Sequence, residues 1–85
     1  MTMTDNDILA ALNDIFQDVF DDPNLVVTPA TTAHDVDGWD SFNNINIFVA
    51  AEMRFGLRFD TAELENLQNV GELVRLISRL LAEKR

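Results

Sequence analysis

The sequence predicts an all-α fold: a small four-helix bundle with three longer helices, one short third helix and a long loop between helices one and two. Three observations support this prediction. Apolar residues recur at intervals of three and four along three stretches, no stretch of any length alternates between apolar and polar residues, and proline or glycine follows two of the three stretches. Helical periodicity without strand periodicity is typical of an all-α domain.

The first helix is expected to begin near Thr4 or Asn6, either of which could cap it. Asp5 and Asp7 suit the positive end of its dipole. Proline cannot continue a helical hydrogen-bond ladder, so the helix should stop at the turn that contains Pro23. Its apolar residues have the spacing of a one-faced helix: Ile8, Leu12, Ile15, Phe16, Val19 and Phe20.

The middle of the chain combines a loop with a second helix. Residues 25–39 carry β-branched residues, Pro29 and three threonines without a sustained period, and we expect a long ordered loop there. Loops of this length in a compact domain are usually functional or disordered. The second helix should begin at Asp40, a good capping residue, and run to about Phe55, where Gly56 ends it.

Two capping-box patterns follow this helix. Asp60 with Glu63 is expected to open a short turn of helix through Leu67, and Asn69 with Glu72 to open the last helix. That helix has a continuous apolar stripe: Val70, Leu73, Val74, Ile77, Leu80 and Leu81. The chain ends on two cations that suit the negative end of its dipole: Lys84 and Arg85.

Composition limits the possible partners. The 85 residues, 47% of them hydrophobic, suit a single domain with a modest core, and the absence of cysteine excludes disulfides, Cys-ligated zinc and a thiol nucleophile. Fifteen acids against six bases give a net charge of −9, which repels nucleic acid phosphates and anionic lipids. All of the excess charge lies in residues 1–40. This charge predicts no nucleic-acid binding. Without a run of 18 apolar residues or a leader pattern, we expect no membrane insertion and a cytoplasmic protein. We expect it to be a monomer.

The second helix has more apolar surface than a small bundle can cover. At 100° per residue, one apolar arc contains Ile47, Phe48, Ala51 and Phe55. The opposite arc contains Phe42, Ile45, Val49 and Met53. One arc should face outward, and an exposed apolar stripe usually marks a partner surface. Periodicity does not decide which arc this is, and the alternative is that the loop 21–39 folds over one of them.

The segment 37–42, Asp-Gly-Trp-Asp-Ser-Phe, opens this helix. Gly38 permits a tight turn, Asp40 caps the helix, and Ser41 lies on the first exposed turn with its hydroxyl near the positive helix end. Such a place suits a phosphate ester. It does not suit a catalytic serine, because a serine nucleophile needs an adjacent base, and we interpret the single histidine, His34, as a surface residue of the loop.

In this order of elements the chain resembles the acyl carrier proteins, the phosphopantetheine-binding carrier family. The resemblance covers nearly the whole chain: an acidic first helix, a long loop, Gly-Trp-Asp-Ser opening helix two, a short third helix and an amphipathic last helix. It implies a bundle of acyl-carrier type, a single carrier domain over residues 1–85, and a carrier rather than an enzyme, without catalytic residues or metal of its own.

The resemblance also implies a covalent modification of the chain and the enzyme that makes it. Ser41 would receive 4′-phosphopantetheine from coenzyme A through a phosphopantetheinyl transferase, which supplies the base and the magnesium. The thiol of the arm would hold acyl, malonyl-type or aminoacyl groups as thioesters. The expected partners are the transferase and acyl-transferring, condensing or acyl-activating enzymes.

Further roles around Ser41 follow from the same resemblance. Asp40 is expected to serve as helix cap and as part of the transferase's recognition surface, and Trp39 to pin the loop against the bundle or to be recognised by partners. The residues expected to face partner enzymes are Phe42, Ile45 and Val49. The residues expected to line a core that can shelter an acyl chain are Ile47, Phe48, Ala51 and Phe55.

The chain departs from the family's usual pattern beside the serine. Phe42 replaces the common leucine, and Asn43, Asn46 and Arg54 stand where fatty-acid carriers are rich in acids. These departures favour a specialised pathway with dedicated enzymes over the usual fatty-acid partners. The cargo stays open among fatty-acid, polyketide and specialised lipid intermediates, with a peptidyl or aminoacyl carrier of a non-ribosomal pathway as the alternative.

Two unrelated classes of protein compete with a carrier. A calcium module is suggested by Asp35, Asp37 and Asp40, but the glycine and glutamate that an EF-hand loop requires are not at their positions. An unmodified acidic interaction module, docking through its exposed stripe, remains an alternative.

Overall fold

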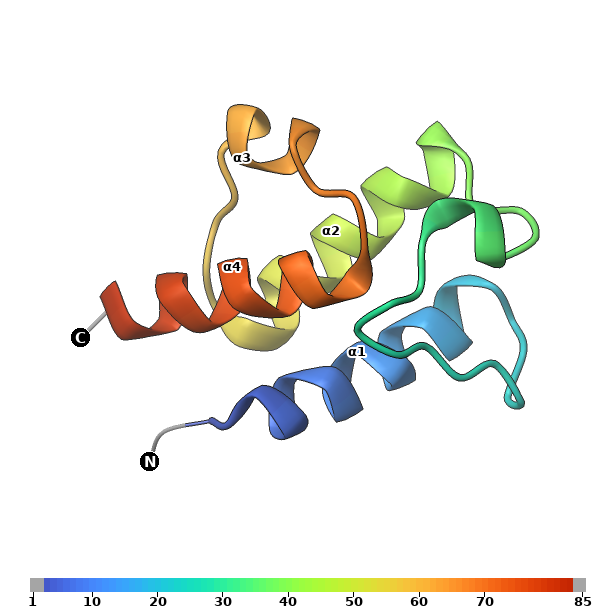
Figure 1. The fold of residues 1–85 in the computed structure, drawn as a ribbon, viewed down its shortest axis with the longest axis horizontal. Coiled ribbons are helices and arrows are strands. Elements are labelled where there is room, and N and C mark those ends of the chain that lie inside the picture. Colours follow the sequence, from blue (N-terminus) through green and yellow to red (C-terminus); the bar gives the residue numbers. More distant parts are fainter. Residues whose placement is uncertain (1–2, 84–85) are drawn as a thin grey trace.

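The computed structural model describes residues 3–83 and contains five helical elements. In chain order they are α1 (Asp5–Val19), the 3-10 turn η1 (Ala33–Asp35), α2 (Ser41–Phe55), α3 (Thr61–Glu65) and α4 (Val70–Glu83). No strand occurs in residues 3–83, so the all-α prediction is confirmed. Helix α1 packs against both α2 and α4, and short α3 lies in the connection between α2 and α4 (Figure 1).

Helix α1 is capped at its start by Thr4 rather than Asn6. The Thr4 hydroxyl accepts from the backbone N–H of Asp7 at 3.1 Å, and the Asp7 carboxylate accepts from the N–H of Thr4 at 3.0 Å. These two bonds form a capping box. These two hydrogen bonds satisfy backbone N–H groups that have no partner within the helix.

The end of α1 corrects one expectation. Phe20 is the C-cap, and the chain reverses at Asp21, whose φ is +51°. The N–H of Asp22 donates to the carbonyl of Gln17 at 3.0 Å, and the N–H of Asp21 to that of Asp18 at 3.4 Å, which is a Schellman motif. The helix therefore ends through its own left-handed cap, before Pro23 could interrupt the ladder.

The core lies between α1, α2 and α4. Its fully buried side chains come from each of these helices and from the long loop: Ile8, Leu12, Phe16, Val27, Ile47, Ala51, Val70 and Ile77. Burying apolar area of this kind is the main favourable contribution to folding. None of the helices in residues 3–83 is long and apolar enough to cross a bilayer.

The long loop between α1 and α2 is ordered by hydrogen bonds to α1 and to α4. The Asn13 carboxamide accepts from the N–H of Val27 at 2.7 Å and donates to its carbonyl at 3.1 Å. On the other side, the first amides of α4 reach the loop: Val70 donates to Thr31 at 2.9 Å and Gly71 to Pro29 at 2.8 Å. The loop thus lies close over the start of α4 (Figure 1).

The two capping boxes expected after α2 are only partly correct. The Asp60 side chain makes no cap hydrogen bond, because the backbone N–H of Glu63 donates to the Asp60 backbone carbonyl at 3.0 Å instead. The Glu63 carboxylate pairs with Arg79 of α4, and α3 ends at Glu65 rather than Leu67. At the start of α4 the Asn69 side chain does accept from the N–H of Glu72 at 2.8 Å. The Glu72 carboxylate, however, accepts from the backbone N–H of Gln68 rather than from that of Asn69. The expected cations Lys84 and Arg85 lie outside the described residues.

Candidate functional site

Ser41 is the first residue of α2 and is exposed. The tight turn before it is possible because Gly38 adopts a φ of +85°. The N–H of Asp40 donates to the Gly38 carbonyl at 2.9 Å, and the Asp40 carboxylate accepts from the N–H of Asn43 at 2.9 Å. Local residues therefore place Ser41 at the helix start, where it is exposed to solvent.

Asn43 stabilises this turn, a role that was not predicted from the sequence. Its side-chain amide donates to the Gly38 carbonyl at 2.7 Å, across the turn that leads to Ser41. The signal available in the sequence was a polar carboxamide three residues after the capping Asp40. Such a side chain can reach back over the first helical turn.

Trp39 packs into the bundle. Its indole N–H donates to Asn44 Oδ1 at 2.9 Å, and its ring meets Phe16 of α1 edge-on, with centroids 5.0 Å apart. The side chain is half-buried. Trp39 therefore pins the end of the loop to both α1 and α2, which is the first of the two roles expected for it.

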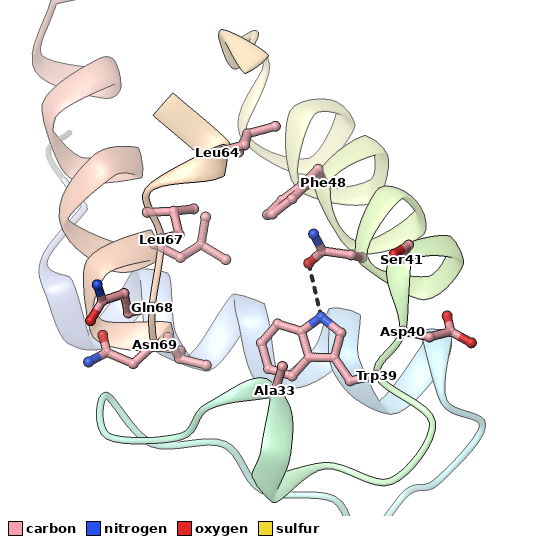
Figure 2. Close-up of a pocket in the computed structure, with 12 residues that line it drawn as sticks. Ala33, Trp39, Asp40, Ser41, Phe48, Leu64, Leu67, Gln68 and Asn69 are labelled. Atoms are coloured by element: carbon pink, nitrogen blue, oxygen red, sulfur yellow. Dashed lines mark hydrogen bonds between the residues drawn. The ribbon is translucent and has the colours of Figure 1, made fainter. Parts of the chain in front are cut away.

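A cavity of about 340 Å³ lies beside Ser41, between α2 and the segment joining α3 to α4 (Figure 2). Phe48 points into it from α2, facing Leu64 and Leu67 on the other side, and Asp40 directs its carboxylate away from it. The cavity is lined by Ala33, Trp39, Asp40, Ser41, Asn44, Phe48, Leu64, Leu67, Gln68, Asn69, Val70 and Leu73.

The two apolar arcs of α2 separate in the structure. The exposed fractions are 72% for Phe42, 61% for Ile45, 48% for Val49 and 81% for Met53. The loop does not cover this arc, so the expected outward apolar stripe is confirmed, and we call these four residues the outward arc.

The inward arc faces the bundle. Ile47, Ala51 and Phe55 are buried in the core, and Phe48 is half-buried. Of these four, only Phe48 lines the cavity beside Ser41. The cavity beside Ser41 therefore lies to one side of the core that the inward arc helps to fill.

The remaining sequence candidates form no site of their own. His34 is exposed in η1. Within residues 3–83, no three Asp, Glu or His side chains are grouped so that they could hold a metal ion.

Comparison with known proteins agrees with this architecture. No family model matches the chain. An acyl carrier protein of Acidothermus cellulolyticus is 33% identical over 78 residues, which is 92% of this chain and 93% of the relative. The meromycolate extension acyl carrier protein of Mycolicibacterium smegmatis is 30% identical over 83 residues, covering 98% of this chain and 84% of that protein.

A solved structure matches as well. The solution structure of a holo acyl carrier protein from Geobacter metallireducens has a TM-score of 0.83 and 43% sequence identity, and covers 89% of this chain and 87% of that one. Identity above 30% over nearly the full length, together with the same helical arrangement, leads to one conclusion: the chain belongs to the acyl carrier protein family, whose members are non-enzymatic carriers with a phosphopantetheine prosthetic group.

Proposed function

We propose that Ser41 is the residue through which this carrier bears 4′-phosphopantetheine. The observation that supports this is the exposed hydroxyl at the first residue of α2, held by a turn that Asp40 and Asn43 fix. The surroundings fit the group, because the hydroxyl is open to a transferase and a partly polar cavity lies next to it. When bound, the group supplies a thiol that holds acyl groups as thioesters, in a chain without cysteine.

The transferase would meet Ser41 from the side opposite the cavity. The Asp40 carboxylate points away from the cavity and uses one oxygen for the helix cap, so its other oxygen is available to a cationic side chain of the enzyme (Figure 2). Trp39 is engaged with Asn44 and Phe16. Its contribution to recognition would therefore be indirect, through the position of the turn.

Partner enzymes of the acyl pathway would dock on the outward arc, of which Phe42, Ile45 and Val49 lie nearest Ser41. The matching partner surface is apolar, because α2 carries only one acid and one base. The Arg54 guanidinium already lies 3.6 Å from the Asp14 carboxylate. Association through such a face should depend little on salt.

The named relatives favour acyl cargo over aminoacyl cargo. The relatives reported above are called acyl carrier proteins, and one is called a meromycolate extension carrier. We propose a lipid or related acyl pathway with dedicated enzymes, since the outward arc lacks the acids that partners of fatty-acid carriers usually meet.

The attachment is tested by mass spectrometry after incubation with a broad-specificity phosphopantetheinyl transferase, magnesium and coenzyme A. The protein should gain the mass of one phosphopantetheine, and Ser41→Ala should gain nothing. The chain has one other serine, so Ser78→Ala is the matched control and should be modified like the wild type. No gain in the wild type, or a gain that persists in Ser41→Ala, would show that the proposal is wrong and would favour an unmodified interaction module.

A further inference from the structure

Two neighbouring asparagines of α2, Asn43 and Asn44, hold the segment that leads to Ser41. The Asn43 side-chain amide donates to the Gly38 carbonyl at 2.7 Å, and Asn44 Oδ1 accepts from the Trp39 indole at 2.9 Å. Neither bond uses the Ser41 hydroxyl. We propose that both asparagines are positioning residues for the modification of Ser41, an inference that rests on the attachment proposed above.

The turn before Ser41 needs a restraint from outside its own backbone. Gly38 has a φ of +85°, and a glycine loses more conformational freedom on ordering than any other residue. Both Asp37 and Gly38 are exposed, so packing contributes little to holding them. The Asn43 side chain supplies the restraint, because it joins Gly38 to the first turn of α2. Without this bond the turn would populate other conformations, and Ser41 would be presented less often.

Asn43 acts in this turn as a hydrogen-bond donor. Its own oxygen accepts from the Asn46 side chain at 3.5 Å. The Gly38 carbonyl also accepts from the N–H of Asp40 at 2.9 Å, so two donors meet at one oxygen. A carboxylate at position 43 would place an acceptor against this carbonyl, with no proton to donate. The donor role is therefore a physical reason for an amide at a position where fatty-acid carriers are rich in acids.

Asn44 acts as an acceptor, which is the opposite role. Its Oδ1 is the partner of the half-buried Trp39 indole, whose ring also meets Phe16 of α1. Without this acceptor the indole N–H loses its partner at a half-buried position, which costs free energy. A carboxylate at position 44 can still accept from the indole. Aspartate should therefore be tolerated at position 44 and not at position 43.

Positioning of this kind predicts a particular kinetic effect. A transferase that captures only chains whose turn is already formed meets a smaller fraction of competent carrier once the restraint is removed. The KM for the carrier should therefore rise, while kcat at saturating carrier stays the same. The loss of one hydrogen bond of about 1 kcal/mol corresponds to a rise of about fivefold. A side chain that acted only in the transition state would lower kcat instead.

The experiment measures kcat and KM for the apo protein with a broad-specificity phosphopantetheinyl transferase, magnesium and coenzyme A. Asn43→Asp and Asn44→Asp add the same charge at adjacent positions, so each controls for the charge of the other. Asn43→Asp should raise KM about fivefold or more. Asn44→Leu should raise KM in the same way, and Asn44→Asp, which restores the acceptor, should restore KM. Equal KM values for the two aspartate variants, or a loss confined to kcat, would overturn the proposal.

The single tryptophan of the chain reports separately on the Asn44 bond, because its indole N–H gives one NMR resonance. Exchange of this proton with water should be slow in the wild type and in Asn44→Asp, and faster in Asn44→Leu. Trp39→Phe removes the donor, so combining it with Asn44→Leu should raise KM no further than either change alone. Additive increases, or unchanged exchange in Asn44→Leu, would overturn the role of the bond.

Circular dichroism at the assay temperature checks that each variant is folded. Asn43→Ala removes the donor without adding a charge, and it replaces the aspartate variant if that variant folds poorly. Val74→Ala truncates a buried side chain of α4, so it should lower the melting temperature and leave KM unchanged. A rise in KM in this control would show that lost stability explains the other variants, and would overturn the proposal.

Mass spectrometry separates failure of this inference from failure of the proposed function. A wild type that gains no phosphopantetheine, or gains it elsewhere than at Ser41, contradicts the attachment. Variants that are modified at Ser41 with wild-type kinetics contradict only the positioning role of Asn43 and Asn44.

Discussion

Single residues hold the long loop against the bundle, and Gly71 is the clearest case. It is the second residue of α4, and a Cβ built there would lie 2.8 Å from the carbonyl oxygen of Pro29. That same carbonyl accepts the N–H of Gly71 at 2.8 Å. The loop approaches the helix so closely because this position has no side chain.

Gly71→Ala should destabilise the protein, although glycine to alanine in a helix normally stabilises by up to about 1 kcal/mol. The new methyl group meets backbone at Pro29, and we expect a net loss of about 1–3 kcal/mol. Thermal unfolding followed by circular dichroism measures this. Arg75→Ala, at an exposed position of the same helix, is the control and should change stability little. A stabilised Gly71→Ala variant would contradict the close approach.

Asp21 is a non-glycine residue in left-handed backbone, with φ of +51°. Asp21→Gly should stabilise by up to about 1 kcal/mol, because it relieves this conformation and removes one acid from a chain of net charge −9. Asp21→Asn removes the charge while tolerating the conformation, so the comparison separates the two causes. Asp21→Ala should destabilise, and an increase in its melting temperature would contradict the cap.

In helix α2, periodicity shows where the apolar side chains lie around the helix, and only the packing shows which of them are buried. Its sequence defines two apolar arcs, but only packing against α1 leaves Phe42 and Met53 exposed while Ile47 is fully buried. Its caps, by contrast, are local: Asp40 at the start and Gly56, with φ of +65°, at the end. Residues that act through their own neighbours in sequence were therefore predictable at this scale.

Truncations in α2 should separate its two arcs. Ile47→Ala should cost about 2–5 kcal/mol as a fully buried truncation. Phe48→Ala should cost less than the about 3–5 kcal/mol of a fully buried phenylalanine, because this side chain is half-buried beside the cavity. Phe42→Ala and Val49→Ala should change stability by within about 0.5 kcal/mol. Denaturant unfolding checks this, and equal losses at all four positions would contradict the outward arc.

In the whole molecule, the excess negative charge comes from one half of the chain, whereas the buried core comes from both halves. The nine acids of residues 1–40 lie on α1 and on the loop leading to Ser41, whereas α2 is nearly neutral. The core draws on α1, α2, α4 and the loop together. Folding therefore brings an acidic half of the chain together with a balanced half.

Repulsion among these acids should make stability depend on salt. Raising sodium chloride from low to near-physiological concentration should raise the melting temperature, because screening weakens repulsion in a chain of net charge −9. Magnesium at equal ionic strength should add little, since residues 3–83 contain no group of acids that could hold a metal ion. A melting temperature independent of salt would contradict the repulsion, and a large excess effect of magnesium would indicate a divalent site.

The helices, several of their caps and the serine at the start of α2 could all be predicted from the order of residues. Thr4, Asp40 and Gly56 act through bonds to residues close in the chain, so their roles follow from local chemistry. The capping box expected at Asp60 does not form, and the Glu63 carboxylate pairs instead with Arg79, a residue distant in sequence. A local sequence pattern does not predict such a distant partner.

Packing between helices, which no single segment encodes, fixes which arc of α2 faces outward, where the loop attaches and where the cavity lies. The Trp39–Asn44 bond, the approach of Pro29 to Gly71 and the facing of Phe48 with Leu64 and Leu67 each join different segments of the chain or fix a side chain between them. Contacts of this kind depend on how helices pack, and periodicity within one segment carries no information about its neighbours.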